Sequence, residues 1–303
     1  MCSLFGWLDY KHVTPQKTLH KLTQALANAA EERGTDAAGI SYIKDDKITI
    51  FKRPKAAHKI HFDIPVGTAA VMGHTRMTTQ GNEKHNYNNH PFPGHAGDMD
   101  FALAHNGMLH NDEKLRKEQN LPDTHIETDS YIAVQLIEHK KALDFNSLKT
   151  MAEELMGSFT FTVMDGQDNM YFVRGDNPMA LYHFPRLGLY LYASTESILQ
   201  KALKKLSLSG EMAVLIDLRC GDLLKIDRAG MVTRARFDDS NLCSYYPMYS
   251  SCYAFDSYGR NAYVDDLKSV ARCFGFEPES IDRLLHLGFQ PEEIEEFMYA
   301  GEI

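Results

Sequence analysis

Short apolar segments separated by turns occupy much of the first 226 residues, and they require a fold that contains β-sheet. Residues 40–51 predict a β-hairpin, because two apolar stretches flank the turn-forming run Asp45-Asp46-Lys47. Other strands are predicted at 69–75, 101–105, 158–164, 169–174, 180–184 and 189–193, with a last hairpin formed by 211–217 and 222–226. Helices are predicted at 127–141, 146–156 and 195–206. The sequence contains no internal repeat.

The first helix is predicted over residues 15–33. Leucines at positions 19, 22 and 26 recur at helical spacing, and Pro15 suits a first helical turn. Thr14 is the expected N-cap, and Gly34 is the residue expected to end the helix.

The composition is that of a globular chain with room for a substantial core. The chain has 303 residues, of which 44% are hydrophobic and 24% charged. A formal net charge of -9 argues against a protein that acts mainly on nucleic acid or on an anionic membrane. No apolar run approaches the roughly 18–20 residues that span a bilayer, and the first residues lack the pattern of a secretory signal.

Cysteine and histidine usage predicts neither a disulfide framework nor a metal site. The number of cysteines is odd, none forms C-x-x-C, and reduced thiols in a cytoplasmic protein are expected; the five are Cys2, Cys220, Cys243, Cys252 and Cys273. Five histidines crowd one loop region without the spacing of metal ligands, namely His85, His90, His95, His105 and His110. We expect no metal and no cofactor.

The composition changes at about residue 237. Residues 237–263 are rich in Tyr, Ser, Asp and Asn, which predicts a linker or an extended arm. Residues 264–303 carry short helical patterns, with Gly288 ending one helix and Pro291 starting the next. The expected domains are therefore 1–236, a Tyr-rich arm at 237–263, and a small helical module at 264–303.

Cys2 is the first residue that suggests chemistry. If Met1 is removed, Cys2 carries both a thiol and a free α-amino group, whose ordinary pKa of about 7.7–8.0 lets it accept the thiol proton. One residue would then supply both nucleophile and base. On position alone, Cys2 can equally be an ordinary second residue.

Three further positions offer groups that suit an amino-acid amide. Arg76 is a planar fork suited to a carboxylate, and Asp129 could bind an ammonium. Asn106 and the Gly107 backbone N–H could stabilise an oxyanion. Each has a simpler explanation: a surface arginine, a helix-dipole partner or a hairpin turn.

Taken together, these segments resemble the glutaminase domain of the class II glutamine amidotransferases, which are N-terminal-nucleophile hydrolases. The resemblance runs from Cys2 to about residue 226 and is nearest in character to the glutaminase domain of glucosamine-phosphate synthase. It rests on Cys2 with Phe5-Gly6, Arg33-Gly34-Thr35-Asp36-Ala37-Ala38-Gly39-Ile40, Gly73–Gly81, Asn89-His90-Pro91-Phe92, His105-Asn106-Gly107, Glu127-Thr128-Asp129, Gly157-Ser158-Phe159, Arg174-Gly175 and Ala193-Ser194-Thr195-Glu196.

The resemblance implies an α+β fold, a four-layer αββα sandwich of two antiparallel sheets, here with a small helical C-terminal extension. It implies that Cys2 is the nucleophile and that Asn106 and Gly107 form the oxyanion hole. Arg76 would hold the α-carboxylate of L-glutamine and Asp129 its α-amino group. Thr79 would also contact glutamine.

Two departures from the family bear on the fate of ammonia. Met77 stands where the family usually has an aromatic that helps to enclose the ammonia path, and Gln80 stands where it often has His. These two departures are consistent with hydrolysis of the amide. They weaken the case for channelling of the ammonia to a second site. No segment resembling a synthase, pyrophosphatase or phosphoribosyl-transferase domain follows residue 226.

The sequence therefore favours a stand-alone glutaminase that forms glutamate and ammonia through a γ-glutamyl thioester. Two alternatives stay open: an amidohydrolase for another amide, and a non-catalytic interaction module that keeps the fold. We expect residues 237–303 to dock an ammonia-accepting partner or a second copy of the chain, rather than complete the active site.

Overall fold

The computed structural model describes residues 2–206, 211–243, 264, 267–268, 271, 276–289 and 291–300. The expectations for the Tyr-rich arm fall mostly outside these residues.

The first sheet has seven strands in the order β11-β9-β10-β1-β4-β2-β3, and neighbouring strands are antiparallel. Strand β1 lies near its centre, between β10 and β4. The bounds are β1 (Ser3–Asp9), β2 (Ala37–Lys44), β3 (Lys47–Arg53), β4 (Ala70–Arg76), β9 (Ala180–Phe184), β10 (Leu189–Ala193) and β11 (Val214–Leu215).

The second sheet has six strands in the order β13-β12-β8-β7-β6-β5, again antiparallel. The bounds are β5 (Phe92–Ala96), β6 (Met99–Leu109), β7 (Gly157–Asp165), β8 (Met170–Arg174), β12 (Asp222–Ile226) and β13 (Val232–Arg236).

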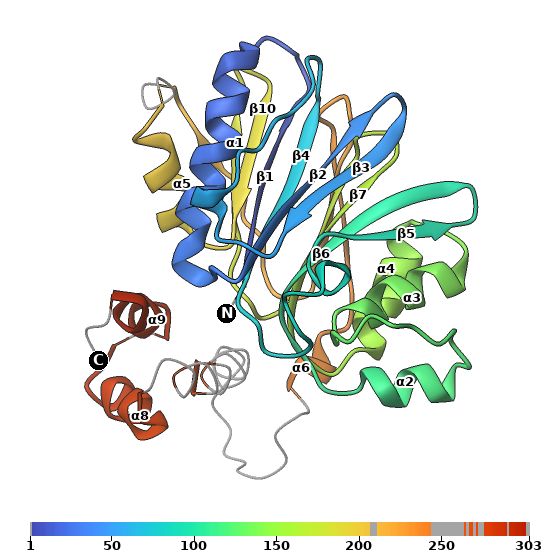
Figure 1. Cartoon of the computed structure of the whole chain (residues 1–303), viewed down its shortest axis with the longest axis vertical. Helices are drawn as coiled ribbons and strands as arrows, with labels where there is room; N and C mark the ends of the chain where they lie inside the picture. The colour runs from blue at the N-terminus through green and yellow to red at the C-terminus, as the bar shows by residue number, and fades with distance from the viewer. Residues whose placement is uncertain are drawn as a thin grey trace.

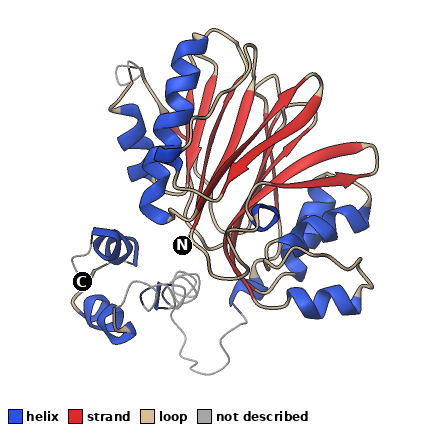
Figure 2. Ribbon diagram, viewed as in Figure 1, coloured by secondary structure: helices blue, strands red, loops and turns tan. Residues whose placement is uncertain are grey.

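Helices cover the outer face of each sheet, so that the molecule has four layers (Figures 1 and 2). Helices α1 and α5 pack on the first sheet, and α3 and α4 pack on the second. The described helices are α1 (Gln16–Ala30), α2 (Asp112–Glu118), α3 (Tyr131–Lys140), α4 (Phe145–Glu154), α5 (Glu196–Leu203), α6 (Ser240–Cys243), α8 (Pro278–His286) and α9 (Pro291–Ala300), with short 3-10 helices η1 (Glu31–Arg33), η2 (Ala57–Lys59) and η3 (Asn86–Asn88). This confirms the expected αββα sandwich.

Strand β1 contributes side chains to two hydrophobic cores, because its side chains alternate between the two faces of the sheet. In β1, Phe5 and Trp7 face the helices, whereas Leu4 and Leu8 face the space between the sheets. Because successive side chains of a strand point to opposite faces, both faces of β1 can be apolar only if both are covered. The seven residues of β1 are all buried, as such an arrangement requires.

The expected hairpin at 40–51 is confirmed as β2 and β3, with Asp45 and Asp46 both at positive φ in the turn. Two other expectations are wrong. The N-cap of α1 is Pro15, and no side chain caps that helix. Thr14 is instead buried, and its backbone N–H donates to Asp9.

The expected last hairpin is also wrong, because its two segments lie in different sheets. Strand β11 pairs with β9 in the first sheet, while β12 pairs with β8 and β13 in the second. The hairpin at this point is formed by β12 and β13. Strand β13 was not predicted because only Val232 and Ala235 of its five residues are apolar, and none is fully buried. Strand β5 and helix α2 were also missed.

The amidotransferase-like unit extends beyond residue 236. Phe237 and Leu242 are each only 4% exposed and belong to the core that α3 and α4 cover. The ring of Phe237 lies 6.0 Å from that of Phe159. The expected boundary at 236 therefore cuts through a packed core, and the unit continues at least to Leu242.

None of the described helices is long and apolar enough to cross a membrane.

Replacing Phe237 by Ala should lower the free energy of unfolding by about 3–4 kcal/mol, because the change removes a buried ring and leaves a cavity. Met231→Ala is the control, since Met231 is 64% exposed and should matter little. Urea unfolding measures both. A loss below about 1 kcal/mol for Phe237→Ala would place residue 237 outside the core after all.

Candidate active site

Cys2 precedes β1 and is held by two contacts. Its thiol donates to the carbonyl oxygen of Met77 at 3.4 Å, and its own carbonyl oxygen accepts from Arg33 Nε at 3.0 Å. Burial raises the pKa of the Cys2 thiol, and the Asp129 charge adds to the rise while Arg76 opposes it. The thiol is therefore neutral near pH 7 and needs a base to become a nucleophile.

Arg76 ends β4, beside the start of β1, because Ser3 pairs with Thr75. Its side chain is buried, and its two terminal nitrogens donate to Asn89 Oδ1 at 2.7 Å and to the Gln80 carbonyl oxygen at 2.5 Å. These contacts fix the guanidinium as a preorganised cation near Cys2.

The segment Arg33–Asp36 fixes the chain around Arg76. A Cβ on Gly34 would lie 2.4 Å from the backbone carbon of Arg76, so only glycine permits this approach. Asp36 donates its N–H to the Arg76 carbonyl oxygen at 3.0 Å and accepts from the Thr78 N–H at 2.7 Å. In the sequence, this segment contributed to the family resemblance, but no role in the active site was predicted for Arg33, Gly34 or Asp36.

Asn106 and Gly107 lie within β6, not in the hairpin turn that an Asn-Gly pair usually marks. The Asn106 side chain is fully buried, yet neither its amide nitrogen nor its oxygen has a hydrogen-bond partner among the described residues. Buried polar atoms are rarely left unpaired, so this amide is available to a bound group. Gly107 has φ +142°, and a Cβ there would lie 2.0 Å from the Ser158 carbonyl oxygen.

Asp129 lies just before α3 and reaches the end of β6. Its carboxylate accepts from the Leu109 N–H at 2.6 Å, and burial raises its pKa. Ser130 joins the same corner, because its hydroxyl shares a 2.8 Å hydrogen bond with His105 Nδ1. Asp129 and Arg76 thus place opposite charges near the Cys2 thiol, since Asp129 raises its pKa and Arg76 lowers it.

Thr79 is not part of this group. It is exposed on the loop after Arg76 and has no hydrogen bond within the described residues. Its expected contact with glutamine stays a prediction.

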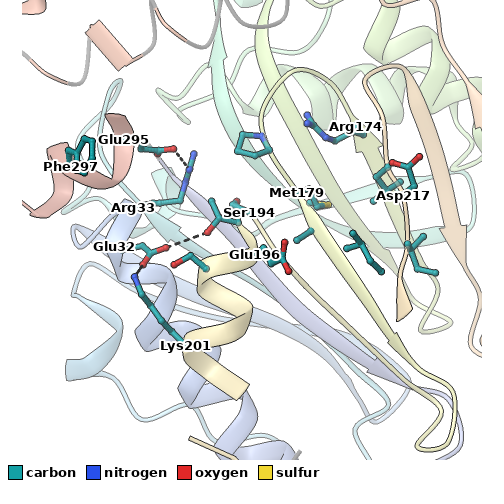
Figure 3. A pocket seen from close by; sticks show the side chains of 17 residues that line it. Glu32, Arg33, Arg174, Met179, Ser194, Glu196, Lys201, Asp217, Glu295 and Phe297 are labelled. Carbon is teal, nitrogen blue, oxygen red and sulfur yellow. Dashed lines mark hydrogen bonds and ion pairs between the residues drawn. The ribbon is translucent and has the colours of Figure 1, made fainter. Parts of the chain in front are cut away.

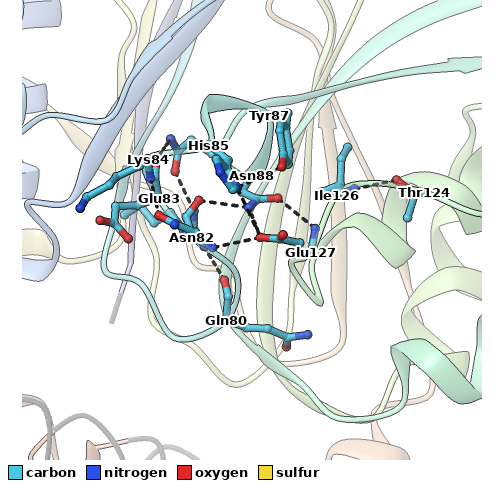
Figure 4. A network of polar contacts seen from close by, with 12 residues as sticks. Gln80, Asn82, Glu83, Lys84, His85, Tyr87, Asn88, Thr124, Ile126 and Glu127 are labelled. Carbon is cyan, nitrogen blue, oxygen red and sulfur yellow. Dashed lines mark hydrogen bonds and ion pairs between the residues drawn. The ribbon is translucent and has the colours of Figure 1, made fainter.

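A polar network holds the long loop between β4 and β5 to the segment that leads to Asp129 (Figure 4). Glu127 accepts from Asn88 Nδ2 at 2.6 Å and from the Asn82 N–H at 3.2 Å, and the Glu127 N–H donates to Asn88 Oδ1 at 2.9 Å. These hydrogen bonds lower the pKa of Glu127, which keeps it ionised. The loop between β4 and β5 carries Gln80 and Asn89, which accept hydrogen bonds from Arg76. The network therefore holds this loop against the segment that leads to Asp129.

The comparisons with known proteins agree with this arrangement. A family model described as "Glutamine amidotransferase domain" matches residues 74–201, a range that includes Arg76, Asn106 and Asp129. Residues 74–201 therefore belong to a glutamine amidotransferase domain.

Relatives with curated names are longer than this chain. A Staphylococcus aureus glutamine–fructose-6-phosphate aminotransferase (isomerizing) is 33% identical over 194 residues, which cover 60% of this chain and 30% of that protein. The enzyme of the same name from Sulfurisphaera tokodaii is 27% identical over 190 residues and is covered to 31%. The chain thus spans about a third of the curated relatives that it matches.

A solved structure shows the same fold. Glutamine phosphoribosylpyrophosphate amidotransferase from B. subtilis superposes with a TM-score of 0.62 at 20% identity, over 78% of this chain and 49% of that one.

Three buried histidines lie close together, with ring centroids 4.1 Å apart for His74 and His90 and 6.5 Å apart for His90 and His105. His74, His90 and His105 are buried, and His74 Nε2 donates to the His105 carbonyl oxygen at 2.9 Å. Burial lowers the pKa of His74 and of His105 to about 3, and that of His90 well below its usual range. Within the described ranges, no group of three or more His, Cys, Asp or Glu side chains could hold a metal ion.

A cavity of about 790 Å³ adjoins the domain and is lined by none of the six expected site residues. Its walls come from η1, from the start of α5, from the β11 region and from α9 (Figure 3). It meets the site only through Arg33, which lines the cavity and also binds the Cys2 carbonyl oxygen.

Lowering the pH from 7.5 to 5 should reduce the free energy of unfolding by about 2 kcal/mol for each of three buried histidines, and by about 4–5 kcal/mol in all once the opposing effect of Asp176 is counted. The three histidines titrate near about 6.5 when unfolded and far lower when folded, so below that pH the unfolded chain binds more protons. Asp176 opposes the effect, because burial raises its pKa to about 6.

Urea unfolding at both pH values tests this expectation, with Asp176→Asn as the comparison. That variant should show a steeper loss of stability on acidification. A stability that stays constant or rises toward pH 5 would show that these histidines are not held neutral.

Proposed function

We propose that the chain hydrolyses L-glutamine to L-glutamate and ammonia through a γ-glutamyl thioester on Cys2. The observation that carries the proposal is the pair of opposite buried charges, Arg76 and Asp129, that both act on the thiol of Cys2. A free amino acid carries the complementary pair at its α-carbon, and its side-chain amide would then extend toward the sulfur.

The thiol needs a base, because burial raises its pKa. Once Met1 is removed, the α-amino group of Cys2 is the nearest candidate, with an ordinary pKa of about 7.7–8.0. It takes the thiol proton as Sγ forms a bond to the amide carbon. It then gives that proton to the leaving nitrogen, so that ammonia departs and the thioester remains.

Water completes the reaction. The same amine accepts a proton from water as the water oxygen attacks the thioester carbon. The bond from that carbon to Sγ then breaks, the amine returns the proton to the Cys2 sulfur, and glutamate is released. In both tetrahedral intermediates an oxyanion forms, and Asn106 Nδ2 with the Gly107 N–H would stabilise it. The unpartnered, fully buried amide of Asn106 supports this role.

The relatives named above are aminotransferases of about twice this length, and their transfer reactions belong to them. We retain an ammonia-accepting synthase partner, or a second copy of this chain, as a hypothesis. A cytoplasmic location fits, because Cys2 must remain a reduced thiol.

Cys2→Ala should abolish ammonia release while leaving the fold intact, because a thiol before β1 contributes little to the core. The glutamine analogue 6-diazo-5-oxo-norleucine should label Cys2 only. Cys220→Ala is the control, since burial raises the pKa of Cys220 to about 12 and makes it unreactive. An active Cys2→Ala variant, or labelling elsewhere, would refute the mechanism.

Arg76→Lys and Asp129→Asn should each cost about 1.5–3 kcal/mol in kcat/KM for glutamine, the scale of one charged hydrogen bond. Lysine keeps the charge but cannot contact Asn89, Gln80 and a carboxylate together. The substrate provides the discriminating test. N-acetyl-glutamine lacks the ammonium and should be a poor substrate in an ammonia assay across a panel of amides. Equal use of both substrates would remove Asp129 from this role.

A further inference from the structure

Helix α9 contacts the amidotransferase domain directly beside Cys2. Its Glu295 forms an ion pair with Arg33 of η1, across 262 positions of sequence (Figure 3). Glu295 is 3% exposed and Arg33 is 1% exposed, so the pair is closed off from solvent. The contact is therefore a built part of the structure, unlike a surface ion pair between mobile side chains.

Arg33 connects this pair to the nucleophile. While its terminal nitrogen meets Glu295, its Nε donates to the Cys2 carbonyl oxygen at 3.0 Å. Removing one member of a buried ion pair leaves an uncompensated charge, which is strongly unfavourable. Without Glu295, the guanidinium loses the carboxylate that orients it, so its hydrogen bond to the Cys2 carbonyl oxygen weakens and Cys2 is less precisely placed.

A second contact joins the C-terminal helices to the same point. Met77 packs against the small apolar cluster formed by Val264, Leu267, Ala271, Ile281, Ile294 and Met298. The carbonyl oxygen of Met77 is the acceptor for the Cys2 thiol. Both groups that hold Cys2 are therefore themselves held by residues beyond 263.

We propose that Glu295 is a positioning residue for Cys2, and that helix α9 thereby supports the active site of its own chain. The proposal rests on the proposed function for its effect on turnover, but its effect on the thiol can be measured separately. It differs from the sequence expectation, in which residues 237–303 dock a partner rather than complete the site. Docking by other faces of these helices stays a prediction.

Glu295→Gln tests the proposal, with Glu293→Gln as its control, because Glu293 is exposed on the same helix. The kcat for glutamine should fall on the order of 10-fold in Glu295→Gln, the scale of a small misplacement of a reacting group. KM should change by less than about twofold, since Arg76 and Asp129 are held by other contacts. Glu295→Asp should recover part of the lost rate.

A second measurement does not depend on turnover of glutamine. Cys2 is alkylated with iodoacetamide at a series of pH values, and the modified peptide is quantified by mass spectrometry. The charged groups that face Cys2 are the terminal amine of the chain, Arg76 from β4, Asp129 from the segment before α3, and Arg33 from η1. Removing the carboxylate of Glu295 takes away a negative charge that pairs with Arg33, and the more positive surroundings favour the thiolate of Cys2. The alkylation midpoint should move to lower pH by roughly half a unit in Glu295→Gln, and not in Glu293→Gln.

The outcomes separate the two proposals. If wild type releases no ammonia from glutamine, the proposed function fails, while the alkylation shift still decides the role of Glu295. If Glu295→Gln matches Glu293→Gln in rate and in alkylation midpoint, the positioning role is wrong. If Glu295→Gln does not fold, Arg33→Lys carries the test. Lysine keeps the charge but cannot contact Glu295 and donate to the Cys2 carbonyl oxygen together, so an unchanged rate and midpoint there would overturn the proposal.

Discussion

The register of β1 between β4 and β10 is the constraint on which the site depends. Leu4 pairs with His74, and Ser3 with Thr75, so the residue before β1 lies beside the end of β4. A shift by one residue would exchange Phe5 and Trp7 with Leu4 and Leu8 between two cores of different shape. The packing of both faces therefore fixes where Cys2 lies relative to Arg76.

Backbone geometry at the site is equally restricted. Gly34 allows η1 to pass against the backbone of Arg76, and Gly107 allows β6 to approach Ser158. A side chain at either position would displace backbone rather than a flexible neighbour. The polar network of Asn88 and Glu127 then orders the loop over this framework, so that the charged groups around the thiol are preorganised before any substrate binds.

Local sequence patterns predicted strands with a clear alternation of apolar residues and turns rich in turn-forming residues. Phe159, Phe161 and Val163 alternate with Thr160 and Thr162, and β7 is buried on both faces as that pattern allows. The hairpin turn at Asp45-Asp46 was also predicted correctly from its residues. The β11 segment was misassigned because its residues are apolar but exposed, and no local signal states which sheet a two-residue strand joins.

The site was predicted only through the resemblance of several ordered motifs to a known family, because single residues such as Asn106 or Asp129 have simpler local explanations. Contacts between distant parts of the chain were not predictable at all. Nothing near Glu295 indicates a partner 262 residues away, and nothing near Phe237 shows that it completes a core with Phe159. Such contacts depend on the folded chain and leave no periodic trace in the sequence.

The central claim is that Cys2 forms the acyl intermediate with its own α-amino group free. Acid-quenched intact-protein mass spectrometry during turnover of glutamine tests it most directly. The account predicts a chain without Met1 that carries one added glutamyl group, located by peptide mapping at Cys2 and absent from Cys2→Ala. Glutamine turnover by a chain that retains Met1, or with no adduct at Cys2 under conditions that preserve thioesters, would contradict it.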